Sequence, residues 1–258
     1  MSFCPLASGS KGNAVYLSSE KSKILIDVGI GYKELVSRLE QINVGINEID
    51  AILITHEHID HIEGLKTIIP KLDIPVFANS ETARGIYESL QLLPSFKIFT
   101  TDEAFEFKDL LIYPFSIQHD TLDPVGFIIK TMGLKIGFCT DLGFATTLVK
   151  KNLEKCDYLY LEANHDLNML YASRRPEALK KRISGRQGHL SNKECVTLLE
   201  AIIHPELKHI FLAHLSSECN SFDLVEKIIK EFVKNKNSKA LVSLAYQDKI
   251  SDLIHFKN

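Results

Sequence analysis

Four side chains of metal-binding type follow an apolar segment early in the chain. His56, His58, Asp60 and His61 come directly after the run Ile52-Leu-Ile-Thr55. If the chain is still extended at His56 and His58, the two imidazoles share one face and can hold a single ion. The turn that follows can direct Asp60 and His61 at a second ion. These ligand types suit zinc, manganese or iron, whereas a histidine-rich loop in contact with solvent is the alternative.

The pattern His-x-His-x-Asp-His after an apolar strand resembles the signature of the metallo-β-lactamase superfamily. The other motifs of that superfamily can be matched in order along essentially the whole chain. The match to Asp27 implies a hydrogen-bond acceptor behind the ligand loop, and the match to Asp141 implies a carboxylate that bridges two ions. The resemblance implies two divalent ions, Zn²⁺ or Mn²⁺, with these ligands: His56, His58, Asp60, His61, His119, Asp141 and His214.

Further motifs resemble the nuclease branch of this superfamily. The loop Leu6 to Asn13, which contains Ser10, is similar to a Gly-Ser-x-Gly-Asn loop of nucleases and phosphodiesterases. Glu162 and His189 resemble a Glu and His pair of tRNase Z, which implies an imidazole kept protonated by a carboxylate and ready to protonate a leaving oxygen. In the same reading, Asp60 orients or deprotonates a hydroxide-forming water that bridges the two metal ions.

A basic segment leads into His189. Residues 174–186 hold six cations against the single acid Glu177, in a chain whose net charge is −3. Such a segment suits contact with phosphates, although a solvated helix face is the usual alternative. The predicted substrate-binding residues are therefore Ser10, Asn13, His165, Lys180, Lys181, Arg182 and Arg186.

These motifs together resemble most closely the YycJ/WalJ-type bacterial metallohydrolases. The resemblance implies a nuclease of the DNA exonuclease kind, with DNA in preference to RNA as the substrate. The interval between Asp141 and His214 is too short for the large inserted domain of RNase J-type enzymes, and no insertion obviously supplies a tRNA-gripping arm. A phosphodiesterase for small cyclic or nucleotide-like esters is the first alternative. A metal-binding regulatory protein without turnover is the second.

Composition sets the wider frame. A chain of 258 residues that is 45% hydrophobic can bury a full core, and we expect a single domain over residues 1–258. Five cysteines without a C-x-x-C pair indicate reduced, mostly buried thiols. The sequence has neither a signal-like start nor an apolar run of membrane-spanning length, so the cytoplasm is the expected location, with no membrane partner.

The elements that must position these residues alternate along the chain. Apolar runs predict two groups of strands, each accompanied by amphipathic helices. This order predicts an α/β fold, a four-layer αββα sandwich in which each half of the chain supplies one sheet. A capping box from Ser191 to Glu194 predicts a helix start just after His189. The strands are expected at 14–18, 23–28, 51–54, 74–78, 110–117, 125–131, 135–139, 157–161, 209–213 and 240–245, and the helices at 33–42, 80–91, 192–203 and 222–235.

Overall fold

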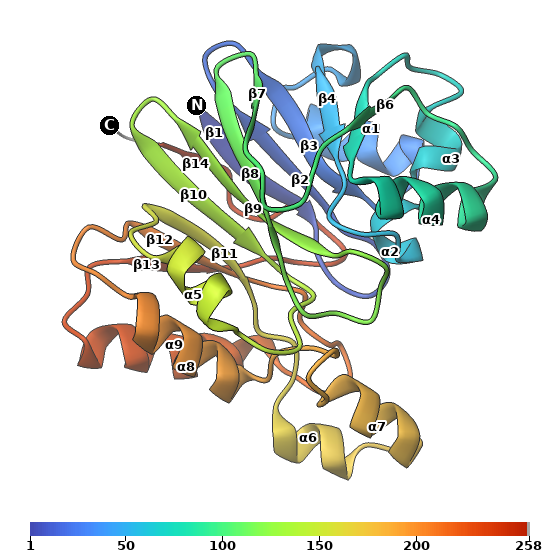
Figure 1. Ribbon diagram of the computed structural model, residues 1–258. Coiled ribbons are helices and arrows are strands. Elements are labelled where there is room, and N and C mark those ends of the chain that lie inside the picture. Colours follow the sequence, from blue (N-terminus) through green and yellow to red (C-terminus); the bar gives the residue numbers. More distant parts are fainter. Residues whose placement is uncertain (257–258) are drawn as a thin grey trace. The chain divides into compact units, whose positions relative to one another are not determined.

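The computed structural model describes residues 1–256, and the chain forms two compact units (Figure 1). Unit 1 comprises Met1–Pro114, Thr121–Val125 and the C-terminal segment from Tyr246. Unit 2 comprises Phe115–Asp120 and Gly126–Ala245. The expectation of a single domain over residues 1–258 stays a prediction.

Unit 1 is built on a seven-stranded sheet with helices after its parallel strands. The pairs β1–β2 and β2–β3 are antiparallel, whereas β3 to β6 run parallel. Strand β4 is short and fully buried, which is why its sequence is continuously apolar and does not alternate. The sheet order is β14 (Ile254–His255), β1 (Ser2–Ala7), β2 (Ala14–Ser18), β3 (Lys23–Val28), β4 (Ala51–Leu53), β5 (Val76–Ala78) and β6 (Phe96–Ile98). The helices are α1 (Tyr32–Glu40), α2 (Ile59–Ile62), α3 (Leu65–Ile68) and α4 (Ser80–Leu90), with a short 3-10 turn at Ile46–Glu48.

The second sheet also has seven strands, and the chain passes from unit 1 to unit 2 within β8. Strands β10 to β13 are parallel, and β9 pairs antiparallel with β10. Phe138 and Tyr160 stack in its core, with ring centroids 4.6 Å apart. The order is β13 (Leu241–Leu244), β12 (His209–Ala213), β11 (Tyr158–Glu162), β10 (Leu134–Cys139), β9 (Val125–Thr131), β8 (Leu110–Ser116) and β7 (Phe105–Phe107). The helices of unit 2 are α5 (Thr147–Leu153), α6 (Leu167–Ala172), α7 (Glu177–Ile183), α8 (Asn192–Ile202) and α9 (Phe222–Asn235).

The expected α/β organisation with two sheets is confirmed, and each expected strand and helix is present with its ends shifted by at most two residues. The capping box at Ser191 forms, and the Ser221 side chain caps α9 by accepting a hydrogen bond from the Leu224 N–H. The sequence did not predict β1, β6, β7 and β14, nor the short helices α2, α3, α5, α6 and α7. These elements have two to seven residues, too few for a hydrophobic period to become visible.

Helices α6 and α7 form a small two-helix element within unit 2 (Figure 1). The Asp166 side chain caps α6 by accepting from the Met169 N–H. Leu170, Ile183 and Cys219 form a separate small hydrophobic cluster under the two helices. This packing fixes the basic segment to unit 2.

The cysteines and the helices were the basis for the expected location of the chain. All five cysteines are buried free thiols, as the sequence predicted. Within residues 1–256, no helix has the length and apolar character that crossing a membrane requires.

Candidate active site

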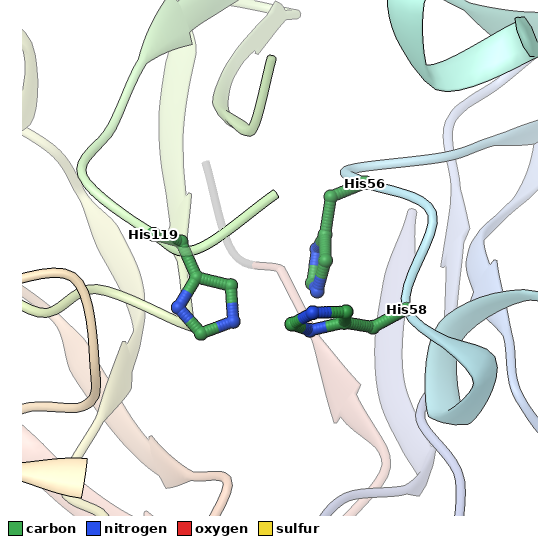
Figure 2. Close-up of side chains that lie close together, drawn as sticks. All are labelled: His56, His58 and His119. Carbon is green, nitrogen blue, oxygen red and sulfur yellow. The ribbon is translucent and has the colours of Figure 1, made fainter. Parts of the chain in front are cut away.

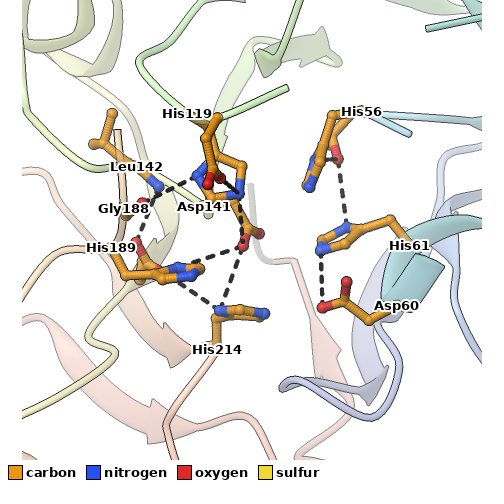
Figure 3. A network of polar contacts seen from close by, with 12 residues as sticks. His56, Asp60, His61, His119, Asp141, Leu142, Gly188, His189 and His214 are labelled. Atoms are coloured by element: carbon orange, nitrogen blue, oxygen red, sulfur yellow. Dashed lines mark hydrogen bonds and ion pairs between the residues drawn. The ribbon is translucent and has the colours of Figure 1, made fainter. Parts of the chain in front are cut away.

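The ligand loop of unit 1 connects β4 to α2. His56 is fully buried in this loop, and His58 is the residue before the first turn of α2. Figure 2 shows the rings of His56 and His58 next to each other, edge to face, with their centroids 4.9 Å apart. The ring of His61 lies 4.1 Å from that of His56, and Nε2 of His61 is 3.6 Å from the Asp60 carboxylate (Figure 3). All four expected ligands of this loop therefore lie close together within unit 1.

Asp27 supports this loop from the end of β3. Its carboxylate accepts hydrogen bonds from the Thr55 N–H at 2.9 Å, the Thr55 hydroxyl at 2.9 Å and Nδ1 of His61 at 2.8 Å. Because Nδ1 of His61 donates to the carboxylate, Nε2 is the nitrogen that carries the lone pair in a neutral His61. Asp27 has a φ of 57°, a left-handed conformation that costs free energy at a non-glycine residue and is frequent at functional sites.

Asn13 connects the glycine-rich loop to the same ligands. Its side-chain amide lies 3.2 Å from Oδ2 of Asp60 and 3.0 Å from Nε2 of His61, and its own N–H donates to the Asp60 carbonyl at 2.8 Å. Gly29 makes this approach possible, because a Cβ there would lie 1.7 Å from the Asp60 carbonyl oxygen. Ser10 is exposed. Of the two residues expected in this loop, Asn13 contacts the ligands and Ser10 faces solvent.

In unit 2, the expected ligands lie at strand ends. Asp141 follows β10 and His214 follows β12, both are buried, and their φ angles are 55° and 54°. Figure 3 shows His189 and His214 joined to Asp141, with Nδ1 atoms 3.6 and 3.5 Å from its Oδ1. His119 follows β8, and its Nδ1 donates to the Gly188 carbonyl at 3.0 Å. Nε2 of a neutral His119 therefore keeps its lone pair and lies 3.8 Å from Asp141.

Glu162, the last residue of β11, joins two of these histidines. Its Oε1 accepts from Nδ1 of His189 at 2.8 Å and from Nδ1 of His214 at 3.1 Å. Its Oε2 accepts from the N–H groups of Leu142 and Leu190, both at 3.0 Å. Full burial raises the pKa of Glu162, but the charge and hydrogen bond of His189 and the hydrogen bond of His214 together outweigh burial and lower this pKa to about 2. Glu162 is therefore an ionised acceptor that fixes the orientation and tautomer of both imidazoles.

The donor set of unit 2 suits a divalent metal. One ligand atom each from Asp141, Glu162, His189 and His214 lies within 4.8 Å of the others. Both oxygens of Glu162 already accept two hydrogen bonds each, so this residue is better suited to orienting ligands than to coordination. Imidazole and carboxylate groups, with no thiolate, match zinc or manganese.

His165 is buried deeply in unit 2. It is 0% exposed, and within residues 1–256 neither of its ring nitrogens has a hydrogen-bond partner. Burial lowers the pKa of its imidazole, although the charges of Glu162 and Glu194 act in the opposite direction. The side chain of His165 offers no exposed surface to a substrate. The expected direct contact of His165 with substrate stays a prediction.

The basic segment divides into exposed and engaged side chains. Arg174, Lys181, Arg182 and Arg186 are exposed. The guanidinium of Arg182 bonds the Asp120 carboxylate, next to His119. Lys180 is only 6% exposed, and its ammonium donates to the Tyr171 carbonyl and to Glu177, each at 2.9 Å. The expected phosphate contact of Lys180 does not fit this position, because its charge is used within the α6–α7 element.

The sequence of this chain matches a known protein family. A model described as the β-lactamase superfamily domain matches residues 22–214, about three quarters of the chain. The chain belongs to the metallo-β-lactamase superfamily. Membership makes this protein a metal-dependent hydrolase, as the sequence predicted.

Relatives and solved structures agree with this assignment. The chain is 32% identical to a Bacillus anthracis protein named exodeoxyribonuclease YycJ, over 91% of this chain and 89% of the relative. It is 34% identical to a Streptococcus pneumoniae D39 protein named exodeoxyribonuclease WalJ, over 85% of this chain and 83% of the relative. The crystal structure of the metallo-β-lactamase fold protein YhfI from Bacillus subtilis is 14% identical and superposes with a TM-score of 0.71, covering 98% of this chain and 99% of that one. The α/β fold predicted from the sequence is thereby confirmed as that of this superfamily.

Sequence reasoning missed several residues that shape the metallo-β-lactamase site of this chain. The Asn164 amide donates to the His214 carbonyl at 2.8 Å, and Thr55 contributes its hydroxyl between Asp27 and the ligand loop. Asp120 holds Arg182 beside His119. Thr55 directly precedes His56, and Asn164 lies between Glu162 and His165. A polar side chain next to an expected site residue was therefore the sequence feature that could have indicated both.

Proposed function

We propose that this metallo-β-lactamase superfamily member is a dinuclear phosphodiester hydrolase that acts on nucleic acid as an exonuclease, with DNA preferred to RNA. The names of the two relatives, both exodeoxyribonucleases, support the substrate class. The exposed cations of the basic segment support it independently, since phosphate contacts need local positive charge in a chain of net charge −3.

The observation that carries the proposal is the double role of Glu162. One carboxylate oxygen accepts from both His189 and His214. His214 is a proposed ligand, whereas the side chain of His189 is 20% exposed and can reach a substrate. A proton donor tied to a ligand in this way serves a reaction with a poor leaving group, such as the alkoxide of a nucleic-acid phosphodiester.

The proposed metal ligands are imidazoles and carboxylates. In unit 1 the fixed tautomer of His61, and in unit 2 those of His119 and His214, leave Nε2 atoms able to bind a cation. Bound divalent ions supply positive charge near the phosphate and a water of lowered pKa. The full set is His56, His58, Asp60, His61, His119, Asp141 and His214.

The side chains of this chain supply the remaining chemistry. We assign to Asp60 the orientation of the attacking water, since its carboxylate is 24% exposed at the start of α2. Glu162 holds His189 through Nδ1 and so directs Nε2 away from the carboxylate, and we assign to an Nε2–H the donation of a proton to the leaving oxygen. We propose that Arg182 and neighbouring cations contact the phosphates of the nucleic-acid substrate.

The first experiment assays purified protein, reconstituted with Mn²⁺ or Zn²⁺, on end-labelled single- and double-stranded DNA and RNA. Stepwise shortening of DNA from one end is expected, with slower loss of RNA. Hydrolysis of bis-p-nitrophenyl phosphate without any loss of DNA or RNA would instead identify a small-molecule phosphodiesterase. Reconstituted protein that hydrolyses none of these substrates would contradict the proposal.

A second experiment counts the ions. Elemental analysis of reconstituted protein is expected to find two divalent ions per chain, and Asp141→Ala is expected to lose at least one, because Asp141 is the proposed bridging carboxylate. One ion or none in the reconstituted wild-type protein would contradict the dinuclear centre without contradicting the hydrolase assignment.

A further inference from the structure

An exposed aromatic ring with a cation above it lies just after Asp141, one of the proposed metal ligands. Phe144 follows Asp141 by three residues and is 39% exposed, unlike the fully buried phenylalanines of the sheet core. The Arg186 guanidinium lies over the Phe144 ring, with its central carbon 4.2 Å from the ring centroid. Neither residue is needed to fill the core of unit 2, so this pair requires another explanation.

The backbone fixes this pair beside the catalytic groups of unit 2. The Leu142 N–H donates to Glu162, and the Gly143 N–H donates to the Gln118 carbonyl at 2.8 Å. A Cβ on Gly143 would lie 2.5 Å from both the Arg186 carbonyl oxygen and the Gly188 N–H nitrogen, so only glycine lets the two loops touch.

The same loops carry the reacting side chains. Figure 3 shows Leu142 and Gly188 close to each other, next to Asp141 and His189. The loop of Phe144 begins at Asp141, and the loop of Arg186 ends at His189. A ligand that rests on the Phe144 ring is therefore bound by the loop that follows Asp141, and the cation over that ring, Arg186, precedes His189 by three residues.

We propose that Phe144 and Arg186 form a stacking platform for the nucleobase next to the scissile phosphate, and that the preferred substrate is a single-stranded end. This inference rests on the proposed function and deepens it by naming how the strand is held. A base inside a duplex has both faces covered by its neighbours, and the terminal pair of a duplex exposes only its outer face, whereas an unpaired end base can place either face on an aromatic ring.

The chemistry of the pair favours a base over other occupants. An aromatic face accepts any of the four bases, and a planar guanidinium can stack on a base while its charge attracts the adjoining phosphate. A single half-exposed ring is too small for a protein interface, which buries about 800 Å² on each partner. Sequence-independent stacking also suits an exonuclease, which must accept every base in turn.

The test uses a short single strand with the fluorescent base 2-aminopurine at its end and nuclease-resistant phosphorothioate linkages. Wild-type protein is expected to quench the fluorescence on binding, because the base stacks on the platform. Phe144→Leu keeps an apolar side chain of similar size but removes the aromatic face, so quenching should be lost and affinity should fall about 5- to 150-fold. Phe144→Tyr should retain both.

Controls separate the platform from general binding. Phe222→Leu, at a phenylalanine of unit 2 that is 43% exposed, should quench and bind as the wild type does. A strand with an abasic end should lose much less affinity in Phe144→Leu than the normal strand, since it has no base to stack. Circular dichroism and urea unfolding check that each variant is folded.

The outcomes distinguish this inference from the proposed function. Wild-type protein that shortens DNA, together with a folded Phe144→Leu that quenches and discriminates abasic ends as wild type does, would overturn the platform alone. Wild-type protein that neither binds nor shortens any strand would overturn the proposed function and, with it, the platform. Arg186→Lys keeps the charge but loses the planar group, and it should reduce the preference for a normal end over an abasic one.

Discussion

Nδ1 of His189 donates a hydrogen bond to the buried carboxylate of Glu162 over 2.8 Å. The carboxylate is held on its other side by two backbone N–H groups, so it cannot rotate away from the imidazole without breaking further hydrogen bonds. His189 is thereby oriented through Nδ1, and its Nε2 is left for the substrate.

Glu162→Gln should lower both stability and metal affinity. The glutamine amide would place an NH₂ group where a carboxylate oxygen now accepts hydrogen bonds, so N–H donors of the protein would lose their acceptor. The free energy of unfolding should therefore fall by about 1–3 kcal/mol in metal-free protein. Zinc affinity should fall about 10- to 100-fold, because His214 loses the acceptor that orients it. Urea unfolding and competitive zinc titration measure these effects. Glu154→Gln, an exposed site in unit 2, is the control, and equal behaviour of the two variants would refute the orienting role.

Asp27→Asn should weaken metal binding through His61. The carboxylate now accepts from Thr55 through one oxygen and from Nδ1 of His61 through the other. The asparagine amide has only one oxygen, so it cannot accept at both positions. Competitive chelator titration should show zinc affinity lower by about 10- to 100-fold. Asp109→Asn, which perturbs a carboxylate bonded to Ser19 and Ser22 in the same unit, should leave zinc affinity unchanged. Loss of affinity in both variants would indicate a general effect on unit 1.

Charge reversal of the exposed cations should weaken DNA binding and its dependence on salt. The variant Arg174→Glu, Lys181→Glu, Arg182→Glu is expected to flatten the plot of log affinity against log salt by about 0.7 to 0.9 per lost phosphate contact. Fluorescence anisotropy at several salt concentrations measures this slope. Lys180 is left unchanged because its ammonium is buried within the α6–α7 element.

The matched control replaces three lysines on α9 by glutamate, and so changes the net charge by the same amount. These lysines are Lys227, Lys230 and Lys234. The control variant should keep most of the wild-type slope. Equal slopes in the wild type and in the variant Arg174→Glu, Lys181→Glu, Arg182→Glu would mean that the basic segment is a solvated surface, and they would favour a small-molecule phosphodiesterase.

Because of His165, the free energy of unfolding should decrease as the pH falls below neutrality. Burial lowers the pKa of this imidazole below the ordinary value of 6.5 in the folded protein, against the opposing charges of Glu162 and Glu194. As the pH falls through 6.5, the unfolded chain gains a proton that the folded chain does not, so stability is lost down to the folded pKa. Urea unfolding between pH of about 7.5 and 5.5 should show a steeper loss for the wild type than for His165→Phe. Parallel curves would contradict a neutral, buried His165.

Much of the site could be predicted because the motifs stand at strand ends. The runs before His56, Asp141 and His214 are apolar and buried, and the polar residue that interrupts each run marks where the strand ends. The sequence also placed His189 before a helix start, because the capping box at Ser191 is a local signal.

The rest depends on contacts between distant segments. The bond between Glu162 and His214 joins residues 52 positions apart, and no local pattern announces it. Lys180 sits in a basic run like its neighbours, and its burial and its hydrogen bonds to the Tyr171 carbonyl and to Glu177 distinguish it from Lys181. Phe144 looks like a core residue in the sequence, since exposure depends on the tertiary structure.

The leaving-group dependence of His189→Ala tests the central claim most directly. Turnover of a DNA phosphodiester, whose leaving alkoxide needs a proton, should fall about 10²- to 10⁴-fold. Turnover of bis-p-nitrophenyl phosphate, whose leaving group needs none, should fall much less, and the metal content should match that of the wild type. His255→Ala, at an exposed histidine, is the control. Equal losses on the two substrates in a fully metallated His189→Ala protein would contradict the role of His189 as the proton donor.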